Sequence, residues 1–458
     1  MTQTSANLSF LRYCLGNNEN MSEVLAKLNW LNLYSFASRQ TVLGLCFDGI
    51  SRLGQEFPDE LKKNPIARDL LMTWMGKAQQ IRRQNMKVNA VAGKLFSMLR
   101  EDGMRCCILK GQGNALMYPN PYSRTPGDID VWVYASRERI MEYAQKRFEL
   151  GDDIRLQHLE TSLDGVPVEL HFFPCSMNNP IYHARLQKWF RRNADLQCSH
   201  IVGLPDKAGD IAIPTTAFNV IYQLTHLYHH FFDEGIGMRQ IIDYFLVVND
   251  FSKNVFLNND LSNHPVNFSN HPVPLSKEGS TFSPSPSSSG SGDVTAPSRC
   301  SEPLRSKDGG PSKVSPDCAG WDRLAIEGDN SAGSTTVVTF SASTALVVVQ
   351  RELKHLGLWK FAGAVMYVLH EALGLPEEKM MAPMDEKRGK LLLAEILNGG
   401  NFGKHFTKYG HFTQQGMAKK YFLKIWRNMH FVRYYPAEAL SEPIFRTWHF
   451  FWRLKHRR

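Results

Sequence analysis

The sequence predicts an α+β protein: a small mixed β-sheet flanked by N- and C-terminal helical regions, with a disordered insert. Two observations carry this prediction. Short apolar runs bounded by turn residues are confined to residues 101–180, whereas helical apolar spacing dominates before and after them. Residues 251–345 are rich in serine, proline, glycine and asparagine and hold few large apolar residues, so they cannot form a core.

The composition is that of a soluble globular protein with room for two or three domains. Of its 458 residues, 43% are hydrophobic. No apolar run approaches the length of a membrane span, and the N-terminus lacks the pattern of a signal peptide, so we expect a cytoplasmic protein. The eight cysteines show no Cys-x-x-Cys spacing, which argues against a zinc site or a disulfide framework.

Residues 1–100 are expected to form a helical N-terminal cap. An apolar stripe begins at Val24, the pattern breaks near residues 51–65, and residues 67–99 form a long amphipathic stretch. We interpret this region as a cap packed on the core; a helix that binds a partner is the alternative.

Residues 101–180 are expected to form the α/β core. Residues 106–109 and 131–133 are apolar runs typical of short buried strands, joined by a polar loop. Ser136 is a suitable N-cap for a helix that reaches about Leu150. Asp164-Gly165 then predicts a hairpin turn between strands 156–163 and 166–172, and Pro167 suggests a free edge or a bulge.

Carboxylates at alternating positions mark the candidate site. Asp128 and Asp130 point to one face of a strand, where their mutual repulsion makes sense if a divalent cation lies between them. Two exposed acids at the start of a strand would be the ordinary alternative. Glu169 lies between two apolar residues on the hairpin's return strand and shares a face with His171. If that strand lies beside the first, three carboxylates converge, a layout suited to two Mg²⁺ ions that bind a nucleoside triphosphate.

Residues 181–250 are expected to be helical again, with a helix from about Pro214 through Phe232. His226 and His230 share a face of that helix. Zinc binding is one interpretation, but no third ligand follows at standard spacing; histidines that bond locally or approach the nucleotide are preferred. Arg239 either reaches a phosphate or pairs with Asp243 one helical turn later.

Residues 346–458 are expected to form a helical region with a basic aromatic tail. Helical patterns end at Gly374 and at Gly399-Gly400, and the turn that follows, residues 401–403, could face a substrate. Residues 404–458 hold twelve Lys and Arg against two acids, so they carry a charge of +10 within a chain whose net charge is +9. Aromatic residues among these charges could contact nucleic acid or an anionic membrane; packing of the aromatics into the core is the alternative.

These motifs together resemble the nucleotidyltransferase fold, whose superfamily includes DNA polymerase β and the aminoglycoside nucleotidyltransferases. The resemblance rests on Lys110-Gly111, on Arg124-x-x-Gly127-Asp128-Ile129-Asp130 and on Glu169. More narrowly, the chain is similar to a bacterial group of uncharacterised nucleotidyltransferases. The further segments that fit this group are His226-x-x-x-His230, Gly235–Gln240 with Asp243, Gly399–Gly403, and Tyr435-Pro436 before Trp452-Arg453.

The resemblance implies a Mg²⁺-dependent enzyme, with Mn²⁺ as a possible substitute, that transfers a nucleoside monophosphate from an NTP to an acceptor. Asp128, Asp130 and Glu169 would hold the metals, and Glu169 would activate the acceptor hydroxyl. The residues expected to bind the nucleotide are Lys110, Gly111, Gly113, Arg124 and Arg239. The superfamily usually has Gly-Ser or Gly-Gly before the carboxylates, whereas this chain has Gly111-Gln112-Gly113 and no serine.

The acceptor is not specified by the sequence: a small molecule, a sugar phosphate, a protein side chain and an RNA end all remain open. The alternative function is a non-catalytic protein that binds a nucleotide or a partner, in which the fold is a scaffold and the basic tail contacts a membrane or RNA.

Overall fold

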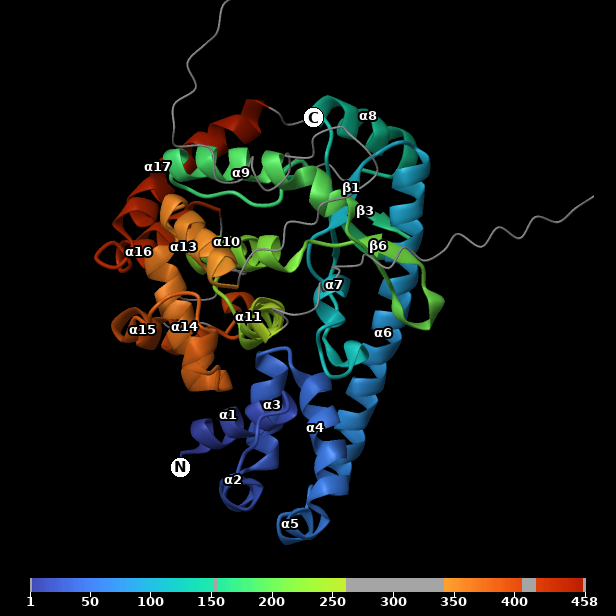
Figure 1. Cartoon of the computed structure of the whole chain (residues 1–458), viewed down its shortest axis with the longest axis vertical. Coiled ribbons are helices and arrows are strands. Elements are labelled where there is room, and N and C mark those ends of the chain that lie inside the picture. Colours follow the sequence, from blue (N-terminus) through green and yellow to red (C-terminus); the bar gives the residue numbers. More distant parts are fainter. Residues whose placement is uncertain (1, 151–154, 261–341, 406–416, 456–458) are drawn as a thin grey trace, which may run out of the picture. The chain divides into compact units, whose positions relative to one another are not determined.

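The four strands predicted in the core pair into one mixed sheet in the computed structural model of the chain (Figure 1). The structure describes residues 2–150, 155–260, 342–405 and 417–455, with side chains in slightly shorter ranges. The strand order is β1-β2-β4-β3, and β2 and β4 run parallel while the outer pairs are antiparallel. The bounds are β1 Cys106–Ile108, β2 Ile129–Val133, β3 His158–Leu163 and β4 Val166–His171. The α+β prediction is confirmed.

Side chains of the two central strands alternate between two layers. Ile129, Val131 and Val133 face an apolar cluster formed with α6 (Arg68–Glu101) and α8 (Arg137–Arg147). Trp132 faces the other way, into the larger core that the remaining helices share. Asp130 lies on the Trp132 face, so the strand period predicted from sequence places the acid opposite the α6 layer.

The hairpin between β3 and β4 forms as the sequence predicts. Asp164 and Gly165 have φ values of 50° and 71°, the left-handed pair that a two-residue turn requires. Pairing of β4 with β2 begins only at Val168, so Pro167 has a strand neighbour on the β3 side alone. Ser136 caps α8 as predicted and accepts a hydrogen bond of 3.3 Å from the backbone N–H of Arg139.

The N-terminal region is helical throughout, with more helices than the pattern indicated. Its helices before α6 are α1 Gln3–Cys14, α2 Met21–Lys27, α3 Trp30–Arg39, α4 Leu43–Glu56 and α5 Pro58–Lys63. The prediction of a break at residues 51–65 is wrong, because α4 continues to Glu56 and α5 begins at Pro58. The long helix α6 contacts α4 at one end and β1 and β4 at the other, so it links this region to the sheet (Figure 1).

A small second sheet between residues 181 and 250 was not predicted from the sequence. After α9 (Pro180–Ser199), β5 (Ile201–Gly203) and β6 (Asp210–Ala212) form an antiparallel pair. These strands have three residues each, too short for a recognisable alternation. Helices α10 (Thr216–Asp233) and α11 (Met238–Asp260) follow, and α11 extends into the range predicted as insert. The predicted disorder of the rest of that insert lies outside the described residues.

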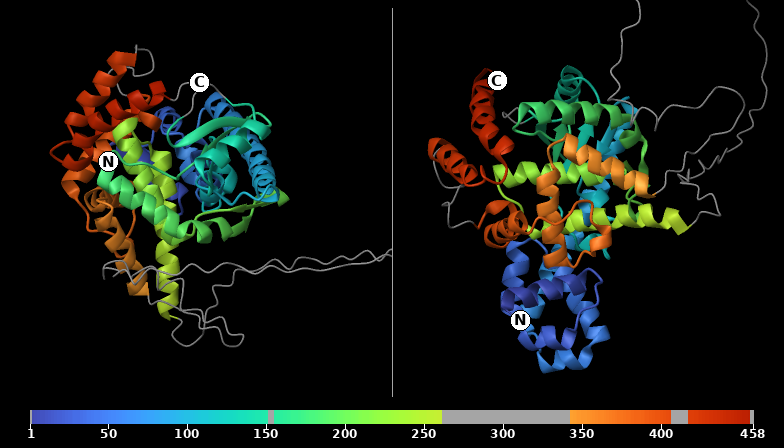
Figure 2. Two further views of the ribbon diagram at one scale, coloured as in Figure 1. Left: turned by 90° about the horizontal axis from the view of Figure 1, so that it is seen from above. Right: turned by 60° about the vertical axis from the view of Figure 1, so that its left-hand side comes forward.

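The C-terminal helices belong to the same compact unit as the N-terminal half. Their bounds are α13 Ala342–His355, α14 Trp359–Leu373, α15 Glu386–Gly399, α16 Met417–Met429 and α17 Pro436–Lys455. Gly374, with φ of 70°, ends α14 as predicted. Helices α16 and α17, red in Figure 2, are fixed to the end of α10, where Asp233 binds Lys424 and Arg446 at 2.8 and 3.1 Å. Several basic residues of the tail therefore pack within the protein.

Among the described residues, five short helices lie in the loops that connect these elements. They are α7 Gln112–Ala115 before β2, η1 Pro121–Ser123 in the same loop, η2 Pro205–Lys207 between β5 and β6, η4 Glu377–Lys379 before α15, and η5 Asn401–Gly403 after α15. Within the described ranges, no helix combines the length and apolar character needed to cross a membrane.

Candidate active site

Three carboxylates converge where β2 and β4 lie side by side. Parallel pairing places Asp130 directly opposite Glu169, and Asp128 immediately precedes β2. One oxygen from each of the three carboxylates lies within 4.8 Å of the others. Asp128 is exposed, Glu169 is half-buried, and Asp130 is 4% exposed. The structure thus brings together the three acids that the sequence placed at the candidate metal site.

Two basic side chains contact these carboxylates. The Lys110 ammonium, from the segment after β1, lies 3.0 Å from Oδ1 of Asp130 and 2.9 Å from Nε2 of His226. His171, two residues after Glu169 on β4, lies with Nε2 3.1 Å from Oδ1 of Asp130 and 3.1 Å from Oε2 of Glu169. Lys110 and His171 therefore hold the buried acids in fixed positions.

The carboxylates differ in how readily they ionise. Repulsion from Asp130, followed by burial, raises the pKa of Asp128 to about 6. Burial alone would raise the pKa of Asp130, but the positive charges of Lys110 and His171 outweigh burial. The net effect is a pKa below the usual value. Burial alone would lower the pKa of His171, but the carboxylates of Asp130 and Glu169 outweigh burial and raise the pKa to about 9. Of the three carboxylates, Asp128 is thus the one that forms no ion pair within the described residues.

The donor set fits a hard divalent cation. Asp128, Asp130 and Glu169 offer only carboxylate oxygens, the ligands that Mg²⁺ and Mn²⁺ prefer. The unfavourable ionisation of Asp128 beside Asp130 is the electrostatic condition that such a cation would relieve.

The polar loop between β1 and β2 is held by hydrogen bonds from two helices, α6 and α10. Asn85 of α6 donates to the carbonyls of Tyr122 and Arg124 at 3.0 and 2.7 Å. Gln223 of α10 and Asn114 exchange two amide hydrogen bonds, of 2.7 and 3.1 Å. Because all of these amides are buried, the loop enters β2 on a rigid path.

Arg124 binds a carboxylate of the protein. It donates from Nε and Nη2 to the two carboxylate oxygens of Asp243 on α11, at 2.9 and 2.8 Å, and both residues are buried. Tyr118 donates to the same carboxylate at 2.8 Å. The alternative expectation that Arg239 pairs with Asp243 is therefore corrected: the planar fork of Arg124 takes both oxygens.

Arg239 lies beside Gly127, the residue that precedes Asp128. It donates from Nη1 to the carbonyl of Thr125 at 3.0 Å, and Nη1 is 4.0 Å from the position that a Cβ on Gly127 would take. Its Nε is buried and has no hydrogen-bond partner among the described residues. Arg239 thus keeps donor capacity beside the residue that precedes Asp128.

The two glycines expected at the phosphates have different surroundings. Gly111 has φ of 54° and ψ of −104°, a backbone conformation that side chains disfavour. A Cβ on Gly113 would lie 2.9 Å from Cγ2 of Ile213, so packing against Ile213 accounts for that glycine.

The paired histidines of α10 hydrogen-bond locally. Nε2 of His230 lies 3.1 Å from Nε2 of His226, which in turn contacts Lys110. The two groups of three potential metal ligands among the described residues include neither histidine. Local hydrogen bonding, the interpretation preferred from the sequence, therefore describes this pair. Through His226, the pair orients the side chain of Lys110. Phe402, in the turn after α15, packs against His230 with ring centroids 5.2 Å apart.

His158 is the site residue that the sequence analysis missed. It pairs with His171 across the hairpin, and its Nδ1 lies 3.4 Å from Oε2 of Glu169. With Glu169 and His171 it makes the second group of potential metal ligands. A signal was available: counting back from the Asp164-Gly165 turn pairs residue 158 with 171.

A family model described as an uncharacterised nucleotidyltransferase matches residues 26–262, a range that holds the sheet and all three carboxylates. The segments quoted above from residues 399–403, 435–436 and 452–453 lie outside the match. No curated protein and no solved structure matches the chain. Because the family model covers more than half of the chain, the protein belongs to the family of uncharacterised nucleotidyltransferases.

Proposed function

We propose that the protein transfers a nucleoside monophosphate from an NTP to an acceptor hydroxyl or phosphate and releases pyrophosphate, in a reaction that depends on Mg²⁺ or Mn²⁺. The observation that carries the proposal is the convergence of Asp128, Asp130 and Glu169 on neighbouring parallel strands, within a chain of this family. Pairs of metal ions held by such carboxylates are a recurrent device for nucleotidyl transfer.

Each carboxylate has a proposed role. Asp128 and Asp130 would hold both metal ions, and Glu169 would complete the metal site. When bound, the metals supply charge neutralisation along the triphosphate and lower the pKa of the acceptor hydroxyl. His171 and Lys110 are positioning residues, because they contact the carboxylates and restrict where the oxygens point.

The transfer itself exchanges one P–O bond for another. The acceptor oxygen attacks the α-phosphorus in line with the bond to the β-phosphate, that bond breaks, and pyrophosphate leaves with its electron pair. The proton of an acceptor hydroxyl passes to the Glu169 carboxylate. Arg239, beside Gly127, and Lys110 are the cations proposed to lie along the triphosphate, while Arg124 acts through Asp243 to hold the loop.

Pyrophosphate release tests this proposal. The intact protein is assayed with each NTP and Mg²⁺ against a panel of hydroxyl and phosphate acceptors. We expect Asp128→Asn and Glu169→Gln each to lower turnover by about a hundredfold or more without loss of fold. Glu160→Gln is the matched control, since Glu160 faces Glu169 across the hairpin but lies outside the carboxylate trio. Full turnover in Asp128→Asn would refute the metal assignment.

A further inference from the structure

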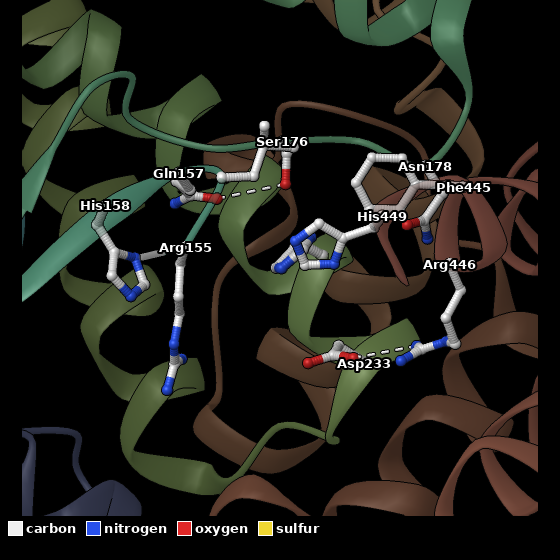
Figure 3. A pocket seen from close by; sticks show the side chains of 11 residues that line it. Arg155, Gln157, His158, Ser176, Asn178, Asp233, Phe445, Arg446 and His449 are labelled. Atoms are coloured by element: carbon white, nitrogen blue, oxygen red, sulfur yellow. Dashed lines mark hydrogen bonds and ion pairs between the residues drawn. The ribbon is translucent and has the colours of Figure 1, made fainter. Parts of the chain in front are cut away.

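A polar cavity adjoins the third carboxylate. It encloses about 180 Å³ and is lined by residues that precede or begin β3, by the segment after β4, by α10 and by α17 (Figure 3). His158, whose Nδ1 lies 3.4 Å from Oε2 of Glu169, forms part of its wall. His158 therefore lines the cavity and also contacts Glu169.

The cavity wall holds ring nitrogens that have no hydrogen-bond partner within the described part of the chain. Nε2 of His158 and Nδ1 of His229 are buried in this way. The same wall holds Gln157, Ser176 and Asn178, whose side chains both donate and accept hydrogen bonds. A hydroxyl group, which donates and accepts, suits this wall.

An apolar groove adjoins the polar cavity. The two share Leu156, Asn178 and Phe445 in their walls, and the groove encloses about 600 Å³. Most of its lining is apolar, from Phe173 and Met177 after β4 and from side chains of α17. This volume is in the range of small-molecule sites, roughly 300–1,000 Å³.

The α17 side of the groove is open to solvent. Ile444 and Trp448, one turn apart, are 73% and 50% exposed. A groove lined by such side chains favours an apolar ligand body.

The two walls of the groove are fixed to each other. Glu438 of α17 accepts hydrogen bonds from the backbone N–H groups of Asn178 and Asn179, at 2.6 and 3.3 Å. Asn179 also donates to Oγ of Ser441 at 3.2 Å. Ser441 and both asparagines line the groove. These hydrogen bonds hold the two walls of the groove at a fixed spacing.

We propose that this cavity and groove form the acceptor site, and that the acceptor is an amphiphilic small molecule. Its hydroxyl-bearing end occupies the polar cavity beside His158, which contacts Glu169, and its apolar body lies along the groove against Phe173, Ile444 and Trp448. The identification as acceptor site rests on the proposed nucleotidyl transfer. It limits the acceptor to amphiphilic small molecules and gives α17 a role in selecting the substrate.

Binding of n-octyl-β-D-glucoside, below its micellar concentration, tests the site by calorimetry on the full chain. Glucose and 1-octanol are the separate polar and apolar probes. We expect the amphiphile to bind at least tenfold more tightly than either probe. We also expect Ile444→Asp to weaken it at least tenfold, since the aspartate places a charge in the groove. Leu440→Asp is the matched control: Leu440 is 53% exposed on the same helix, one turn earlier, and does not line the groove.

Stabilisation by Mg²⁺ and an NTP is measured in the same variants, so the two proposals are tested separately. Unchanged nucleotide binding in Ile444→Asp, together with lost amphiphile binding and lost amphiphile-dependent pyrophosphate release, would support the acceptor site. Equal amphiphile binding by the wild type, Ile444→Asp and Leu440→Asp would overturn it, as would absent amphiphile binding in a protein that binds Mg²⁺ and an NTP. Amphiphile binding without any nucleotide binding would contradict the proposed function and with it the acceptor role.

Discussion

At the level of single residues, Asp128 is the one of the site's three carboxylates whose ionisation is least favourable. Asp130 has Lys110 and His171 as partners, whereas Asp128 gains less from Lys110 than it loses to Asp130 and to burial. An acid whose pKa in the folded protein exceeds its unfolded value stabilises the fold below the unfolded pKa and loses that effect as pH rises through the folded pKa. For Asp128 the loss falls between about pH 4 and 6.

The first prediction follows from the raised pKa of Asp128. Without divalent cations at pH 7.5, Asp128→Asn is expected to raise the melting temperature by on the order of 1 °C, because it removes a repulsion at an exposed side chain. At pH 4 the difference should vanish. Melting curves of both proteins at the two pH values measure it. A variant less stable than the wild type at pH 7.5 would contradict the electrostatic account.

Arg124 and Arg239 are expected to fail in different ways. Arg124→Met leaves Asp243 buried without its bidentate partner and should cost about 3–5 kcal/mol in the free energy of unfolding. Arg239→Met should cost less stability but weaken NTP binding at least tenfold, roughly 1.4 kcal/mol. Denaturant unfolding and nucleotide titration of both variants separate these roles. The assignment is wrong if Arg124→Met retains stability or if Arg239→Met binds NTPs normally.

At the level of elements, the β3–β4 hairpin determines the geometry of the candidate site. Its turn fixes the register, and the register places Glu169, His171 and His158 around one point. The sequence contained this information, because a two-residue turn leaves one pairing and the strand period of two then sets each face. It did not contain the Arg124–Asp243 pair, since residues 119 positions apart meet only when α11 packs on the loop. For the same reason, nothing in the sequence placed α17 beside the segment after β4.

The turn makes the next prediction. Gly165 has φ of 71°, so Gly165→Ala should cost roughly 1–2 kcal/mol of stability and weaken Mg²⁺-dependent NTP binding through the displaced hairpin. Gly76→Ala is the matched control, because Gly76 lies inside α6 with open space around it and should gain about 0.5–1 kcal/mol. Unfolding free energies of equal sign in the two variants would contradict the register argument.

At the level of the whole molecule, the C-terminal helices complete the proposed acceptor site. The basic tail is predicted to be either a contact surface or a packed stripe, and its described part holds both exposed aromatic side chains, such as Trp426 and Phe451, and packed ones. Phe431 is buried and Lys424 pairs with Asp233. Burial raises the pKa of Asp233, but Lys424 and Arg446 outweigh it and hold the pKa well below its usual range. An acid with a lowered pKa stabilises the fold above its unfolded pKa, so this contact should persist from pH 5 to 8.

Asp233→Asn is therefore expected to loosen α16 and α17 and lower stability by about 1–2 kcal/mol. Amide hydrogen exchange of residues 436–449 should rise more than exchange in the sheet. Glu386→Gln is the control: Glu386 pairs with Lys390 on an exposed helix face and should change stability by less than about 0.5 kcal/mol. Unaltered exchange in α17 would show that other contacts hold these helices.

The central claim is that Asp128, Asp130 and Glu169 form a metal site for a nucleoside triphosphate. A thermal-shift titration with each of the four NTPs, with and without Mg²⁺, tests it most directly on the wild type, the Asp128→Ala/Asp130→Ala double variant and Glu160→Gln. We expect one NTP to raise the melting temperature by several degrees at saturation, roughly 2–3 kcal/mol, only with Mg²⁺ and only in the wild type and Glu160→Gln. No shift with any NTP, or an equal shift in the double variant, would contradict the claim.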